Sequence, residues 1–125
     1  MKRILAVDDE PDILELLVEI LGIEGYAISA ASDGRAALEL LQGTGADLVI
    51  TDTMMPRVDG VALIRSMRDS PGLCDIPVII MSAAGRPNLD GLDICAFLHK
   101  PFDLIALLDA VAEAIDCGPS QKPSA

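Results

Sequence analysis

The 125-residue sequence has no tryptophan, one tyrosine and two phenylalanines. Aromatic platforms on which nucleic acid bases or a flavin ring could stack are therefore absent, and the core must be built from aliphatic residues and methionine. The single histidine, His99, excludes a metal site with two histidine ligands. The three cysteines, Cys74, Cys95 and Cys117, have no metal-ligand spacing, so we expect reduced thiols in a cytoplasmic protein.

Basic residues and long apolar runs are also scarce. Nine Lys and Arg oppose 20 Asp and Glu, which gives a formal net charge of −11. This charge repels phosphate backbones and anionic lipid, so the sequence argues against direct nucleic acid or membrane partners. No apolar run approaches the roughly 18 residues of a membrane span. The first run ends at Asp8, too early for a signal peptide, and no Gly-x-x-x-x-Gly-Lys-Ser/Thr loop for nucleotide phosphates is present.

The length and the spacing of apolar residues predict one α/β domain. Short apolar runs predict five strands, at residues 4–7, 26–30, 48–52, 77–81 and 96–99. Glycine and proline interrupt residues 83–93, where we expect only a short or irregular fourth helix about residues 88–92. The Pro/Ser-rich end predicts a domain over residues 1–117 and a disordered tail or linker over 118–125.

Continuous apolar strands that alternate with helices are typical of a parallel sheet with helices on both faces. We therefore predict a flavodoxin-like, doubly wound, five-stranded sheet with strand order 2-1-3-4-5. In this order the first and third strands are neighbours, and the crevice at their carboxyl ends is the usual place for a ligand.

Polar side chains stand at the ends of four of these strands. Asp8 and Asp9 follow the first strand, Asp52 ends the third, Ser82 follows the fourth and Lys100 follows the fifth. Two carboxylates about 5 Å apart repel by roughly 3 kcal/mol at an effective dielectric near 20, so three in one crevice favour a divalent cation. Oxygen ligands with retained waters suit Mg²⁺. With an ammonium and a hydroxyl added, the crevice is suited to a phosphoryl group.

Each of these residues also has an ordinary structural interpretation. Asp52 could open a turn. Asp8, Asp9 and Glu10 could be a helix cap and solvated acids beside a helix start. Ser82 could cap the next helix, and Lys100 could be a surface lysine before a proline. Their joint occurrence at four strand ends favours a site.

Four motifs resemble those of response regulator receiver domains of two-component signalling. They are Val-Asp-Asp-Glu-Pro at 7–11, Asp-Thr-Met-Met-Pro-Arg-Val-Asp-Gly at 52–60, Met-Ser-Ala at 81–83 and Phe-Leu-His-Lys-Pro-Phe at 97–102. The resemblance covers the chain from about Arg3 to Ile115. It implies that Asp52 is the phosphoacceptor and that Mg²⁺ is bound by Asp9 and Asp52, by Asp8 through a water and by the backbone carbonyl of Met54.

The resemblance also implies a switch. Lys100 would be the charge partner of the phosphoryl group, Ser82 would turn toward that group, and Phe97 would occupy the aromatic switch position. The domain would take the phosphoryl group from a histidine kinase or a histidine phosphotransfer protein and would signal by contact with a downstream protein. It would catalyse only its own phosphorylation and dephosphorylation.

Some departures from the family pattern keep other readings open. Because the last helix has no Lys or Arg after Lys100, a dimer joined by salt bridges for DNA binding is not expected, and we expect a monomer or weak dimer. The shortened segment before Lys100 favours an alternative, a phosphorylation-independent protein-interaction module with the same fold.

A haloacid dehalogenase-type phosphatase would also use an aspartyl phosphate, but it would need a second Asp two residues after the nucleophile. Met54 stands at that position, which argues against this class.

Overall fold

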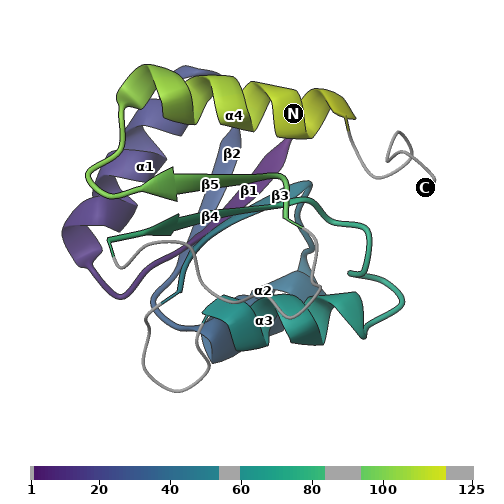
Figure 1. Cartoon of the computed structure of the whole chain (residues 1–125). Coiled ribbons are helices and arrows are strands. Elements are labelled where there is room, and N and C mark those ends of the chain that lie inside the picture. Colours follow the sequence, from purple (N-terminus) through teal and green to yellow (C-terminus); the bar gives the residue numbers. More distant parts are fainter. Residues whose placement is uncertain (1, 54–59, 84–93, 118–125) are drawn as a thin grey trace.

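A computed structural model describes residues 2–53, 60–83 and 94–117 as an α/β domain in which one sheet lies between two pairs of helices (Figure 1). The elements, in chain order, are β1 (Arg3–Val7), α1 (Pro11–Ile23), β2 (Ala27–Ala31), α2 (Gly34–Gly43), β3 (Leu48–Asp52), α3 (Gly60–Arg68), β4 (Val78–Ser82), β5 (Ala96–His99) and α4 (Leu104–Cys117).

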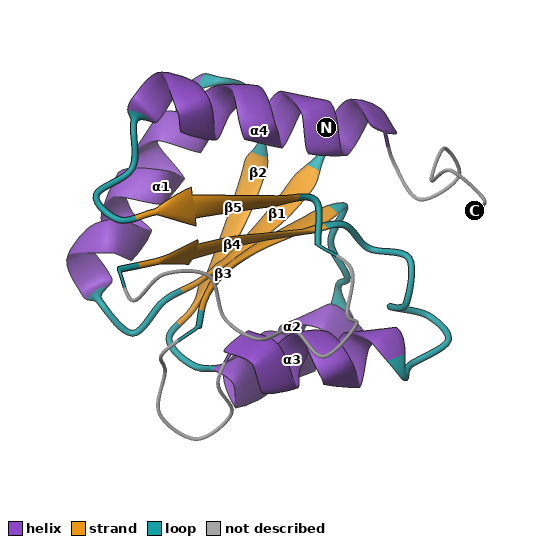
Figure 2. Cartoon of the chain, in the orientation of Figure 1, coloured by secondary structure: helices purple, strands orange, loops and turns teal. Residues whose placement is uncertain are grey.

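The five strands form one parallel sheet in the order β2-β1-β3-β4-β5, which confirms the predicted topology (Figure 2). Every residue of β3 and β4 is buried, whereas β2 and β5, at the two edges, are largely half-buried or exposed. From β1 the chain adds β2 on one side, whereas β3, β4 and β5 follow one another on the other side. The order of the strands therefore reverses between β1 and β3. Their carboxyl ends therefore form the crevice at which open α/β sheets bind ligands.

The sheet has an apolar core on each face, because alternate residues of a strand point to opposite sides. One core packs α1 and α4 against β1, β3 and β4, and the other packs α2 and α3 against the same strands. Leu17 of α1 and Leu107 of α4 are fully buried in the first core, and Leu63 and Met67 of α3 are fully buried in the second. The prediction of helices on both faces is confirmed.

The helix and strand ends follow local chemistry. Helix α1 begins at Pro11, which lacks the N–H that a first helical residue leaves unpaired, and α2 begins after Asp33, whose Oδ1 accepts the Ala36 N–H at 2.8 Å. Strand β2 begins one residue later than the sequence predicts. The reason is that the N–H of Tyr26 donates to Leu21 O at the end of α1, and pairing with β1 starts at Ala27.

Two sequence predictions fall outside the described residues. The short or irregular helix expected about residues 88–92 lies between β4 and β5, in residues 84–93. The expected tail, residues 118–125, follows α4. Both therefore stay predictions.

Gly60 places the start of α3 directly against the end of β3. Its N–H donates to Thr53 O at 3.1 Å, and a Cβ at this position would collide with the backbone oxygen of Asp52 and lie 2.9 Å from Thr53 Cα. A helix can approach this strand end only because residue 60 has no side chain.

We predict that Gly60→Ala lowers the free energy of unfolding by about 1–3 kcal/mol, the usual cost of overpacking, because backbone rather than a flexible side chain must move. Gly22→Ala is the matched control: Gly22 lies in α1 with no atom within 4 Å of an added Cβ, so this change should be neutral or stabilising by up to about 1 kcal/mol. Urea unfolding measures both. A Gly60→Ala protein as stable as the wild type would contradict the close approach.

Candidate phosphoryl-transfer site

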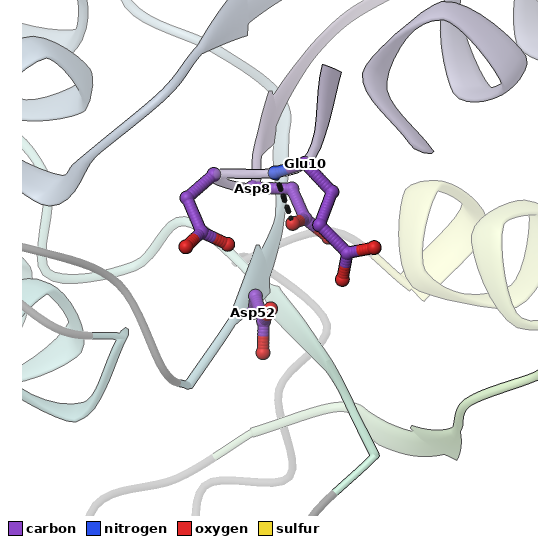
Figure 3. A group of neighbouring side chains, drawn as sticks. Asp8, Glu10 and Asp52 are labelled. Carbon is purple, nitrogen blue, oxygen red and sulfur yellow. Dashed lines mark hydrogen bonds between the residues drawn. The ribbon is translucent and has the colours of Figure 1, made fainter. Parts of the chain in front are cut away.

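Four carboxylates gather at the carboxyl ends of β1 and β3, and Figure 3 shows those of Asp8, Glu10 and Asp52. One oxygen from each of Asp8, Asp9, Glu10 and Asp52 lies within 4.8 Å of the other three. Asp8 is fully buried and Asp52 is 6 % exposed, whereas Asp9 and Glu10 are exposed. Two charges 4.8 Å apart repel by roughly 3 kcal/mol at an effective dielectric of about 20, so the cluster requires positive charge.

The backbone fixes one oxygen of each buried carboxylate. Asp8 Oδ1 accepts the Glu10 N–H at 2.9 Å, which holds the turn between β1 and α1 (Figure 3). Asp52 Oδ1 accepts the Thr53 N–H at 2.7 Å. The Oδ2 atom of each carboxylate faces the same ammonium group instead.

That ammonium belongs to Lys100, which follows β5. Its Nζ lies 2.7 Å from Asp8 Oδ2, 3.1 Å from Asp52 Oδ2 and 3.3 Å from Glu10 Oε1. The Lys100 N–H donates to Ser82 O at 2.9 Å, which continues the pairing of β4 with β5 and brings the side chain to this edge of the sheet. The Lys100–Pro101 peptide is cis. The three carboxylates can use all three ammonium hydrogens.

The pKa shifts in the site have opposing causes. Burial raises the pKa of Asp8 above its ordinary 3.8, and the hydrogen bonds from Lys100 and from the Glu10 N–H offset only part of this effect. Burial alone lowers the pKa of Lys100, but its hydrogen bonds to Asp8 and Asp52 outweigh burial, so the pKa is raised. Lys100 therefore stays protonated. Its single positive charge faces several carboxylates, so the site keeps an excess of negative charge.

Ser82 and Phe97 lie on the two strands beyond Asp52. Ser82 is fully buried at the end of β4, and its Oγ accepts a hydrogen bond from Thr53 Oγ1 at 2.9 Å. Phe97 lies opposite Ile80 in the pairing of β4 with β5 and packs, partly buried, against the core on the α2 and α3 side.

The structure brings together most of the side chains that the sequence singled out. Asp8, Asp9 and Asp52 join one cluster, and Lys100 contacts the two buried members of it. Met54, the predicted carbonyl ligand, lies outside the described residues. The site roles of these residues stay predictions.

Two residues that contact this site were not predicted from the sequence. Glu10 shares Lys100 with Asp8 and Asp52, and its place in the acidic Asp-Asp-Glu run was the available signal. Thr53 contacts both Asp52 and Ser82, and the only signal was a hydroxyl residue directly after a predicted strand.

A parallel sheet of this order, with an acidic crevice between β1 and β3 and a lysine directly after β5, defines a doubly wound α/β domain with a charged cluster at the carboxyl ends of its strands. The family model of the response regulator receiver domain matches residues 4–112. The chain belongs to this family and is a receiver domain of a two-component response regulator.

Curated relatives agree with this assignment. Response regulator MprA of Mycolicibacterium vanbaalenii is 39 % identical over 110 residues, which are 85 % of this chain and 47 % of the relative. The DNA-binding dual master transcriptional regulator RpaA of Synechocystis is 36 % identical over 115 residues, 89 % of this chain and 48 % of that protein. The chain thus spans about half the length of the curated relatives it matches.

Solved structures show the same fold. The receiver domain of a signal transduction histidine kinase from Syntrophus aciditrophicus has a TM-score of 0.85 and 32 % identity, with 93 % of this chain and 91 % of that chain covered. The chemotaxis response regulator CheY4 of Vibrio cholerae has a TM-score of 0.84 and 27 % identity, with 91 % of this chain and 98 % of that chain covered.

Within residues 2–53, 60–83 and 94–117, no helix has the length and apolar character needed to cross a membrane.

We predict that Asp8→Asn raises the free energy of unfolding of the metal-free domain at neutral pH by roughly 0.5–2 kcal/mol, because it removes a charge that burial disfavours and that Lys100 stabilises only in part. The gain should depend on pH. Since folding raises the pKa of Asp8, the native state holds more protons than the unfolded chain from about pH 3.8 up to the raised value, and wild-type stability falls as the pH rises through that window. Asp8→Asn lacks this contribution.

Denaturant unfolding at a series of pH values, with a chelator present, measures the difference between the two proteins. The difference should grow as the pH rises through the window and then level off. Asp12→Asn, which replaces an exposed acid in the first turn of α1, is the control and should show no such growth. A wild type more stable than Asp8→Asn at neutral pH would contradict the electrostatic account.

Proposed function

We propose that this domain is the phosphoacceptor of a two-component phosphorelay and that Asp52 takes a phosphoryl group from a histidine kinase or a histidine phosphotransfer protein. The observation that carries the proposal is the contact of Lys100 Nζ with both Asp8 Oδ2 and Asp52 Oδ2 in a crevice where Asp52 is still 6 % exposed. A nucleophile that is still slightly exposed to solvent and a fixed cation are thereby combined at one edge of the sheet.

For phosphoryl transfer the protein mainly positions the reacting groups and stabilises their charge. An Asp52 oxygen forms a bond to phosphorus, the phosphorus–nitrogen bond of phosphohistidine breaks, and the imidazole keeps the bonding pair. A carboxylate nucleophile needs no general base. Lys100 neutralises charge on the phosphoryl oxygens, and the Thr53 N–H keeps the Asp52 carboxylate in its orientation.

The residues of the crevice fit Mg²⁺. The donors are carboxylate oxygens gathered within 4.8 Å, two of them from exposed residues that leave room for retained waters. Asp9 and Asp52 would hold the ion directly and Asp8 through a water, together with the carbonyl of Met54. When bound, the ion supplies positive charge against the phosphoryl oxygens.

The signal would leave the site through Ser82 and Phe97. The Ser82 hydroxyl turns to donate a hydrogen bond to the phosphoryl group, and Phe97 moves into the space that Ser82 leaves, which changes the surface around β5. The output is a contact with a downstream protein by a monomer or weak dimer in the cytoplasm. The net charge of −11 disfavours a direct contact with nucleic acid.

The first test is intact mass after incubation with acetyl phosphate, with and without Mg²⁺. We expect a gain of one phosphoryl group in the wild type that requires Mg²⁺ and is removed by hydroxylamine. Asp52→Asn should show no gain. Asp69→Asn, which changes an exposed acid after α3, should behave like the wild type.

The opposite results identify the alternative. A folded wild type that gains no mass would favour the phosphorylation-independent interaction module, and a pull-down would then follow. A gain retained in Asp52→Asn would place the phosphoryl group on another residue.

A second prediction concerns the metal. At a Mg²⁺ concentration a hundredfold above its Kd, binding to the folded state alone stabilises by about 2.7 kcal/mol, seen as a higher Tm. Asp9→Asn should lose most of this gain, because Asp9 is a proposed direct ligand. Asp12→Asn should retain it, since Asp12 is exposed and outside the carboxylate cluster. Equal gains in both variants would show that Mg²⁺ binds elsewhere.

A further inference from the structure

Thr53 joins the carboxylate of the proposed phosphoacceptor to the hydroxyl of the proposed switch residue Ser82 through two hydrogen bonds. Its N–H donates to Asp52 Oδ1 at 2.7 Å, and its hydroxyl donates to Ser82 Oγ at 2.9 Å. Both side chains of the second bond are buried, with Thr53 7 % exposed and Ser82 fully enclosed. A hydrogen bond between two buried hydroxyls, 29 residues apart in the chain, fixes where the Ser82 oxygen lies.

The alternation of side chains puts this bond on one face of the sheet. Val78 and Ile80 of β4 pack in the core on the α2 and α3 side, and Ser82 continues that row. Leu48 and Ile50 of β3 pack in the opposite core, and Asp52 continues their row. Ser82 must therefore turn from the α2 and α3 side toward Asp52 to reach a phosphoryl group.

We propose that Thr53 is a positioning residue that holds the Ser82 hydroxyl in its resting orientation and so sets how readily the domain switches. This inference rests on the proposed function, because it assumes that Ser82 turns toward a phosphoryl group on Asp52. In the resting state Ser82 Oγ accepts the Thr53 hydrogen. In the switched state Ser82 donates to the phosphoryl oxygen and the bond from Thr53 is lost.

The loss has a definite free-energy consequence. Water does not readily replace the partner of a hydroxyl on a residue that is 7 % exposed, so breaking the bond disfavours the switched state by the net worth of one neutral hydrogen bond. Removing the hydroxyl from residue 53 removes this bias. Phe97 packs against the core on the same face of the sheet.

The test uses beryllofluoride, a phosphoryl analogue, at saturating Mg²⁺. Thr53→Val keeps the shape of the side chain and removes the donor, and we expect beryllofluoride to bind about fivefold more tightly, the factor for one neutral hydrogen bond. Three-bond couplings at Ser82 should show, in the free protein, a changed χ1 rotamer population. Thr53→Ser retains a hydroxyl and should restore wild-type affinity.

Two further variants separate this role from general packing. Thr51→Val is the matched control, because Thr51 is a buried threonine of β3 whose hydroxyl donates to Asp52 O at 2.9 Å and not to Ser82. It should leave the affinity for beryllofluoride unchanged. In a Ser82→Ala background, Thr53→Val should have no effect, since the acceptor is already gone.

The outcomes distinguish this inference from the function on which it rests. A wild type that binds beryllofluoride, with Thr53→Val no tighter or weaker than the wild type, overturns the role of Thr53 and leaves the phosphoacceptor function standing. An equal gain in the Ser82→Ala background also overturns it, because the effect would not pass through Ser82. A wild type that binds no beryllofluoride overturns both.

Discussion

The contact of one ammonium group with carboxylates from two other strands is the interaction on which the site depends. Lys100 lies 92 residues from Asp8 and 48 residues from Asp52, so the contact forms only when β1, β3 and β5 occupy their places in one sheet. Burial then strengthens the interaction, because the surrounding dielectric is lower than that of water. The same burial makes each ionised carboxylate destabilising unless a positive charge lies beside it.

This balance makes the crevice a poor element of stability and suits it to the cation that we propose it binds. Asp8 is fully enclosed and its pKa is raised by burial, which shows that its surroundings favour ionisation less than water does. Lys100 offsets part of the excess negative charge, and the rest remains available to a bound cation. A crevice that binds a cation, as we propose, is destabilised while that cation is absent.

The sequence was sufficient for the topology and for most of the crevice, for physical reasons. The strands are continuous apolar runs, and parallel strands place whatever follows them at one edge, so Asp8, Asp52 and Lys100 could be brought together from their positions alone. The start of β2 was misplaced by one residue because Tyr26 is apolar enough to continue the run, and only its hydrogen bond to Leu21 O shows that it belongs to the turn after α1.

Contacts between side chains could not be predicted in the same way. The bond from Thr53 to Ser82 depends on the register of β3 with β4, in which Asp52 lies opposite Met81, and on the rotamers of two hydroxyl residues. Neither is encoded by an apolar pattern. The strand ends supply the charged side chains of the site, and charges interact even between neighbouring strands. The proposed switching depends instead on one short-range hydrogen bond, from Thr53 to Ser82.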